Sequence, residues 1–152
     1  MTMKSRKACL VAGLAGIMSL GVMIAPALSH HSFAMYDQQQ TKTYTGRLTR
    51  FIPGGNHSQL IFEVLDAEGK QVMQNGKPLL WGVETASAAA MSRQGVTVVT
   101  FPLGTILTVT LHPLRDGRPM GAMTSLIKCG TAMPKGGCTK ETGQVMTGTE
   151  AT

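Results

Sequence analysis

Five apolar segments that alternate with polar residues run through the middle of the chain, and one alanine-rich stretch interrupts them. The segments are residues 41–52 (TKTYTGRLTRFI), 58–66 (SQLIFEVLD), 77–84 (KPLLWGVE), 105–114 (TILTVTLHPL) and 119–128 (PMGAMTSLIK). Successive side chains of a strand point to opposite faces, so this alternation predicts five strands with one buried face each. In the first segment, Tyr44, Leu48 and Ile52 share the predicted buried face.

The alanine-rich stretch, residues 85–94 (TASAAAMSRQ), is predicted to be a short helix. Thr85 or Ser87 can cap its first turn, and Gly95 can end it. The predicted order is therefore three strands, a helix and two strands, which is the element order of an OB-fold. We expect an all-β fold, a small five-stranded OB-like barrel with one short helix between strands 3 and 4. A less regular β-sandwich is the alternative.

The N-terminus has the three parts of a secretory signal peptide. Lys4, Arg6 and Lys7 form a positive head, residues 8–25 are almost entirely apolar, and small residues precede a predicted cut after Ser29. The chain would then consist of a signal peptide at 1–29, a barrel domain at 30–128 and a tail at 129–152. A permanent membrane anchor is the alternative, because the apolar run is close to the shortest length that spans a bilayer.

Cleavage would lower the charge of the chain and leave two of its three cysteines. Without residues 1–29 there remain eleven basic and eight acidic residues, a formal charge of +3 that does not indicate nucleic acid binding. Export favours disulfides, so Cys129 and Cys138 are predicted to form one, with a free thiol pair or a metal site as the alternative. The polar residues after Cys138 are expected to form a flexible tail or a short edge strand.

Four blocks that follow one another between His30 and Ile127 carry a family resemblance. They are HHSFAMYD, TGRLTRFIPGGNH, LLWGVETASAAAMSRQG and FPLGTILTVTLHPLRDGRPMGAM. In this order they resemble a family of small exported bacterial proteins, classed as a domain of unknown function, whose mature chain starts with HHSF. Where that family usually has Asn-Pro-His, this chain has Gly55-Asn56-His57; Asn56 and His57 match, and the proline is missing. The resemblance implies an exported β-domain and supplies no activity.

The predicted cut places histidine at the start of the mature chain. A cut after Ser29 would free the α-amine of His30, which could bind one metal ion together with its ring nitrogen. A second histidine would complete a three-nitrogen site suited to copper, which favours tetragonal nitrogen ligation. His57, in the glycine-rich segment PGGNH, is the preferred partner, and His31 and His112 are the others.

We therefore predict copper at His30, His31 and His57. A cut one residue earlier would put His31 third in the chain, an arrangement that also binds copper(II). The alternative is that these histidines only make structural hydrogen bonds or pair with Asp37.

Three secondary candidates carry other chemistry. Met120 and Met123 have the M-x-x-M spacing of some copper(I) sites, but residues three apart on a strand face opposite ways, which favours core packing. Glu84 is the acidic residue of an apolar segment; if buried, its pKa would be raised and it could act as an acid or base. Otherwise it caps the helix or pairs with Arg93. No catalytic motif is present, so an enzyme is not expected.

These observations favour a periplasmic or secreted binding module with copper as its ligand. The main alternative is an envelope protein without a metal, which docks on an unknown partner protein through the HHSF segment. Nucleic acid binding is not expected, because the chain has one Trp and few other aromatic residues. No permanent membrane span is expected once the signal is removed.

Overall fold

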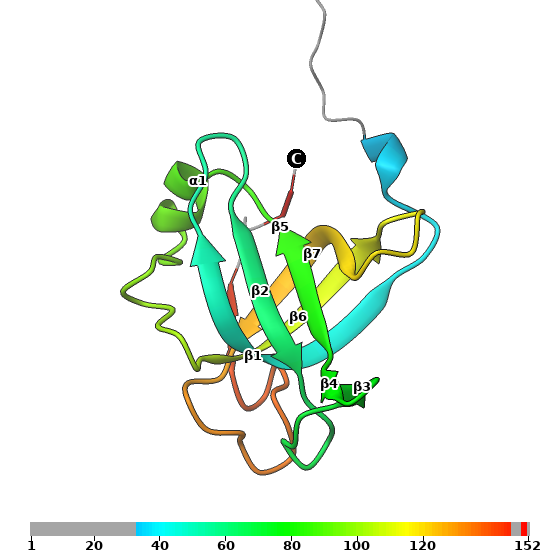
Figure 1. Cartoon of the computed structure of the whole chain (residues 1–152). Helices are drawn as coiled ribbons and strands as arrows, with labels where there is room; N and C mark the ends of the chain where they lie inside the picture. The colour runs from blue at the N-terminus through cyan, green and yellow to red at the C-terminus, as the bar shows by residue number, and fades with distance from the viewer. Residues whose placement is uncertain (1–32, 147–149, 152) are drawn as a thin grey trace, which may run out of the picture. The chain divides into compact units, whose positions relative to one another are not determined.

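Five strands close into a barrel in the computed structural model, which describes residues 33–146, 150 and 151 (Figure 1). They are β1 (Lys42–Ile52), β2 (Gln59–Val64), β5 (Leu80–Glu84), β6 (Ile106–Pro113) and β7 (Met120–Lys128). Antiparallel pairing gives the order β5-β2-β1-β6-β7, and β5 closes the barrel by pairing with β7 in parallel. This connectivity is that of an OB-fold, so the predicted small all-β barrel is confirmed and the β-sandwich alternative is wrong.

The barrel interior is filled by the apolar side chains that alternation assigned to it. On β2, Leu60, Phe62 and Val64 are buried, and the residues between them are partly exposed. The largest fully buried side chains are Phe62, Phe101, Leu48, Leu60, Met91, Ile106, Leu107, Leu111, Met123, Leu126, Val83 and Val96. Each such side chain contributes about 1.5–3 kcal/mol relative to an exposed one. Strand side chains therefore stabilise the barrel together with Met91 of α1 and with Val96 and Phe101 of the loop after it.

One predicted core position on β1 is wrong. Ile52 is 38% exposed, although its spacing from Leu48 placed it on the buried face. The pairing register between β1 and β2 shifts between Leu48 and Arg50. A β-bulge of this kind inserts one residue and reverses the faces beyond it. Phe51 therefore packs against the main core in place of Ile52.

The predicted helix forms but is shorter than expected. α1 covers Ala88–Arg93, and Ser87 is its N-cap, with its hydroxyl accepting a hydrogen bond from Ala90 N at 3.2 Å. Gly95 has a φ of +75°, a value that side-chain-bearing residues rarely adopt, and it ends the helix. Met91 is fully buried in the main core. The helix lies at the same end of the barrel as the β1–β2 turn (Figure 1), and Ala88 N donates to Gly54 O at 2.8 Å.

The third predicted strand is divided in two. β3 (Met73–Gln74) and β4 (Lys77–Pro78) form a separate hairpin, and β5 begins only at Leu80. Asn75 and Gly76 connect the hairpin with φ values of 51° and 73°, as the Asn-Gly turn prediction requires. Pro78 lacks an amide hydrogen and so cannot continue a strand ladder into β5.

A disulfide and a short extra strand hold the C-terminal part against the barrel. Cys129 and Cys138 are bonded, with Cα atoms 5.7 Å apart, which confirms the predicted disulfide and excludes a free thiol pair or a metal at these residues. β8 (Gln144–Met146) pairs with the end of β7, and Ala151 N donates to Met123 O at 3.1 Å. None of the described helices has the length and apolar character needed to cross a membrane.

Candidate functional site

The segment before β1 is attached to the outside of the barrel. After the 3-10 helix η1 (Phe33–Met35), Tyr36 forms a β-bridge with Leu114, and Asp37 N donates to Pro113 O at 2.8 Å. The Tyr36 side chain is 5% exposed and packs with Leu114 and Ala122. The described chain therefore starts at a fixed place on the surface of β6 and β7.

Tyr36, His57 and Glu84 come together there, and we call them the Glu84 cluster. Glu84 is the last residue of β5, and His57 comes from the turn between β1 and β2. The Tyr36 hydroxyl donates to Glu84 Oε2 at 2.8 Å, and His57 Nδ1 lies 3.5 Å from Glu84 Oε1. The side chains of His57 and Glu84 are 25% and 20% exposed, so solvent and ligands can reach both. The carboxylate thus bridges a buried phenol and an accessible imidazole.

The Tyr36 hydroxyl stays protonated over a wide range of pH. Burial raises the pKa of Tyr36 above its ordinary value, and the hydrogen bond to Glu84 and the negative charge of Glu84 raise it further. Arg118 opposes this shift. Tyr36 is therefore a hydrogen-bond donor to Glu84. Glu84, the residue predicted as a possible acid or base, has a structural partner in this hydroxyl.

The hydrogen bonding of His57 fixes which ring nitrogen is free. Its Nδ1 lies 3.1 Å from the carbonyl oxygen of Thr85. A carbonyl can only accept, so Nδ1 carries the hydrogen, and in the neutral ring Nε2 has the lone pair. A histidine held through one nitrogen by a carbonyl and a carboxylate is the usual arrangement of a metal ligand.

A second histidine lies on the same face of the sheet. Glu84 pairs with Ala122, which pairs with His112 on β6, so the three share one row across the strands. Neighbouring strands are about 4.8 Å apart, which puts Glu84 and His112 about 10 Å from each other. His112 Nδ1 also donates to a carbonyl oxygen, that of Gln40, at 2.8 Å. Both described histidines therefore have Nδ1 occupied and Nε2 available.

The remaining predicted site residues fall in different places. His30 and His31 lie outside the described residues, as does the predicted signal peptide. Met123 is buried in the main core, whereas Met120 packs with the Tyr36 group, so the two methionines belong to different clusters. Among the described residues, no three His, Cys, Asp or Glu side chains gather closely enough to hold a metal ion.

Tyr36 is the member of the cluster that the sequence did not indicate. It stands in the HHSFAMYD block, where the histidines drew attention, and only the tertiary structure brings it to Glu84, 48 positions later. Near Tyr36 the sequence shows only a tyrosine followed by polar residues. This local pattern does not indicate that the hydroxyl contacts Glu84.

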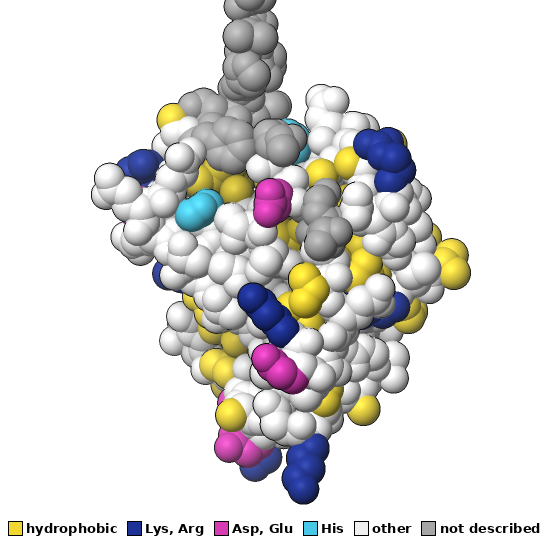
Figure 2. Space-filling model, turned by 180° about the vertical axis from the view of Figure 1, so that it is seen from behind, with side chains coloured by type: hydrophobic (Ala, Val, Ile, Leu, Met, Phe, Trp, Pro, Cys, Tyr) yellow, Lys and Arg dark blue, Asp and Glu magenta, His cyan; other side chains and the backbone are white. Residues whose placement is uncertain are grey.

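The surface around these residues carries dispersed charge. On the face seen in Figure 2, opposite to that of Figure 1, Lys and Arg side chains stand apart from one another among acidic, apolar and polar ones. For the residues described, that face has no continuous basic stripe of the kind that follows a nucleic acid backbone.

Comparison with known proteins gives one match. The model of a family described as "Family of unknown function (DUF6152)" matches residues 17–123. The match spans β1, the Glu84 cluster and most of the barrel. No curated protein and no solved structure matches the chain.

Proposed function

The chain belongs to this family of unknown function, and from that premise we propose that it is an exported copper-binding protein. The metal would be held by His57 and by the histidines His30 and His31 at the start of the mature chain. The proposed role is to bind copper(II) through amine and imidazole nitrogens, which suits the tetragonal preference of this ion.

The orientation of His57 is the observation that carries the proposal. Thr85 O accepts the Nδ1 hydrogen at 3.1 Å, and Glu84 Oε1 lies 3.5 Å from the same nitrogen. Such partners fix the orientation of the ring, which is why they accompany most histidine ligands. The side chain of His57 is 25% exposed, so an ion can approach it from solvent.

The length of the chain allows the terminal histidines to contribute. His31 precedes Tyr36 by five residues, three of which form η1, so this segment spans about 13 Å, from about 2.0 Å per 3-10 residue and about 3.4 Å per extended residue. Tyr36 and His57 both contact the carboxylate of Glu84. A segment of that length, starting from the anchored Tyr36, can therefore bring a histidine back toward His57.

Export is supported by two features of the chain. Residues 1–29 have the composition of a signal peptide, and cleavage there is what would create the terminal amine of His30. The Cys129–Cys138 disulfide fits an oxidising compartment such as the periplasm.

The test starts from protein purified without a tag from the cells that make it. Mass spectrometry of the intact protein gives the first residue of the mature chain. Copper(II) is then titrated into it, with isothermal calorimetry for the affinity and electron paramagnetic resonance for the nitrogen ligands. We expect one copper ion per chain, and a loss of affinity of at least tenfold in His57→Ala.

His112→Ala is the matched control, because this histidine has the same Nδ1 bond to a carbonyl but lies two strands from Glu84. It should bind copper as the unchanged protein does. Equal affinity in His57→Ala and the unchanged protein would exclude this site. Failure to retain any copper would favour the alternative, a metal-free protein that docks through the HHSF segment.

A further inference from the structure

A pocket with a cavity volume of about 200 Å³ lies where β1 begins and the β6–β7 loop turns. Its polar lining comes from Asp37, Gln40, Lys42, Arg115 and Arg118, and Trp81 forms one wall. We call it the Trp81 pocket. His57, the described residue among the copper ligands proposed above, does not line it.

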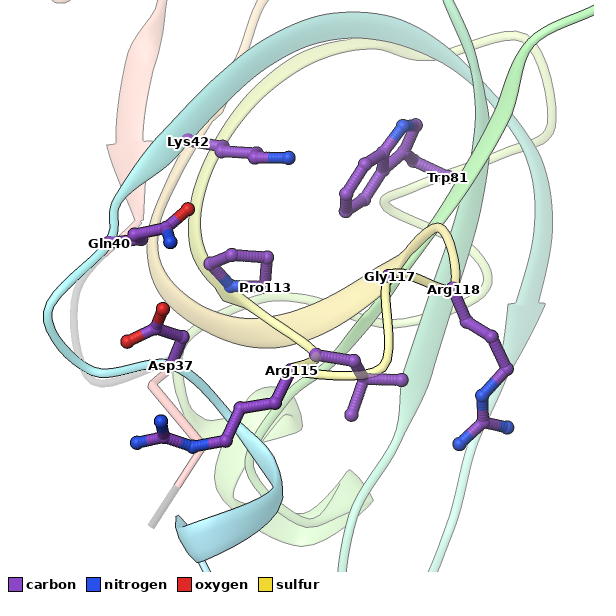
Figure 3. Close-up of a pocket in the computed structure, with 9 residues that line it drawn as sticks. Asp37, Gln40, Lys42, Trp81, Pro113, Arg115, Gly117 and Arg118 are labelled. Atoms are coloured by element: carbon purple, nitrogen blue, oxygen red, sulfur yellow. The ribbon is translucent and has the colours of Figure 1, made fainter.

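The indole of Trp81 contacts an aromatic ring and a cation. The ring of Tyr44 packs against it with centroids 4.6 Å apart, which fixes its position. The ammonium group of Lys42 lies 5.3 Å from the ring centroid. Figure 3 shows Lys42 extending across the pocket toward Trp81, with Asp37 and Gln40 on the side away from the indole. Cation–π contacts at exposed sites are weak, so an anion can draw the Lys42 ammonium away from the ring.

The pocket has more positive than negative charge. Three cations, Lys42, Arg115 and Arg118, line it together with one carboxylate, Asp37. Arg118 is paired outside the pocket, with its Nε 2.8 Å from Asp116 Oδ2. Within residues 33–146, 150 and 151, neither Lys42 nor Arg115 forms an ion pair.

Arg115 is nevertheless held at the rim. Its Nε donates to Ala34 O at 3.0 Å, and its backbone N donates to Met35 O at 3.0 Å. In Figure 3, Arg115 and Arg118 stand on either side of Gly117 at the turn of the loop. The planar guanidinium group of Arg115 presents further N–H donors in the geometry that matches a carboxylate or a phosphate.

We propose that the Trp81 pocket binds a small organic anion, a carboxylate or phosphate carried on a body no larger than one sugar ring. The anionic group pairs with Lys42 and with Arg115, whose guanidinium points away from Trp81 in Figure 3 and would turn inward on binding. The body packs on the walls formed by Trp81, Pro113 and Leu114. The cavity is smaller than the 300–1,000 Å³ of typical ligand sites, so it fits a small molecule or the terminal unit of a longer chain.

The fluorescence of Trp81 offers a direct test, because it is the only tryptophan of the chain. Protein purified from the producing cells is titrated with glucuronate, glucose 6-phosphate, inorganic phosphate and glucose, and calorimetry repeats each titration. We expect saturable changes with glucuronate, glucose 6-phosphate or both. The response to one of them and not the other identifies the anionic group. Glucose, which has no charge, should give none, and inorganic phosphate should bind at least tenfold more weakly.

Lys42→Gln and Arg115→Gln should each weaken the binding seen by calorimetry at least tenfold. Lys140→Gln is the control, since Lys140 is an exposed lysine that does not line this pocket, and its affinity should be unchanged. Added NaCl should weaken binding in the unchanged protein, which tests the charge contribution even if a variant fails to fold. The proposal is overturned by equal binding of glucose or of inorganic phosphate, by unaltered affinity in both variants, or by no saturable binding of either organic anion.

Discussion

The Glu84 cluster and the Trp81 pocket are built around adjacent residues of one segment, yet they present opposite chemistry. Tyr36 donates to Glu84, whereas Asp37, the next residue, lines the pocket of Lys42 and Trp81. In the cluster the carboxylate of Glu84 contacts Tyr36 and His57, and the proposed copper ligand is the other imidazole nitrogen of His57. In the pocket, Lys42 and Arg115 form no ion pair with a described residue, and they are the groups proposed to bind an anion. Short extended segments can supply two sites because successive side chains point in opposite directions.

Truncation of Trp81 should have the largest effect. The indole is 7% exposed and belongs to the main core, so Trp81→Ala should lower the free energy of unfolding by about 3–5 kcal/mol. Urea denaturation followed by circular dichroism measures this. Leu80→Ala is the control: its side chain is exposed next to Trp81, and its cost should stay within about 0.5 kcal/mol. Equal costs for the two variants would mean that the pocket wall is not part of the core.

Removal of the disulfide should cost about 2–3 kcal/mol, because the bridge closes a short loop. In the Cys129→Ser/Cys138→Ser double variant, the midpoint of urea denaturation should fall accordingly. Copper and anion affinities measured well below that midpoint should not change, since neither cysteine belongs to the Glu84 cluster or the Trp81 pocket. A change in either affinity would show that the C-terminal loop shapes that site.

Glu84→Gln should separate the two sites. Loss of a carboxylate beside a histidine ligand typically weakens metal binding 10- to 100-fold, which corresponds to about 1.4–2.8 kcal/mol. Copper titration should show this loss, while glucuronate or glucose 6-phosphate should bind the variant as before. Lys42→Gln should give the reverse pattern. Parallel losses of both affinities in either variant would contradict two independent sites.

Tyr36→Phe should have the smallest effect at neutral pH, a loss of about 1 kcal/mol for one hydrogen bond. Its signature is the pH dependence. Because the pKa of Tyr36 is raised in the folded protein, its contribution is fully present below the unfolded value of about 10 and is lost as the pH rises above it.

The unfolding free energy of the unchanged protein should therefore fall more steeply above about pH 10 than that of Tyr36→Phe. Burial also raises the pKa of Tyr44, but Tyr44 is present in both proteins, so the difference between them reports on Tyr36. Identical slopes in alkaline urea titrations would mean that the phenol is not buried in solution as it is in the structure.

The sequence predicted the barrel well because local patterns report local structure. Period-two alternation located β1, β2, β6 and β7, and the alanine-rich stretch located α1. Two predictions failed because of pairing between strands. The bulge after Leu48 places Ile52 on the surface, and because residues 73–78 form the β3–β4 hairpin, β5 begins only at Leu80. Bulges depend on the partner strand, so one strand's pattern does not reveal them.

By itself, the sequence determined the order of strands and helix, the disulfide between Cys129 and Cys138 and the likeness to a family of unknown function, because each rests on spacing along the chain. Only the tertiary structure decided that Tyr36 would reach Glu84 and that Lys42 would lie over Trp81. These contacts join residues about 40 or more positions apart, and barrel closure, which follows from the burial of all five apolar faces at once, is what brings them together.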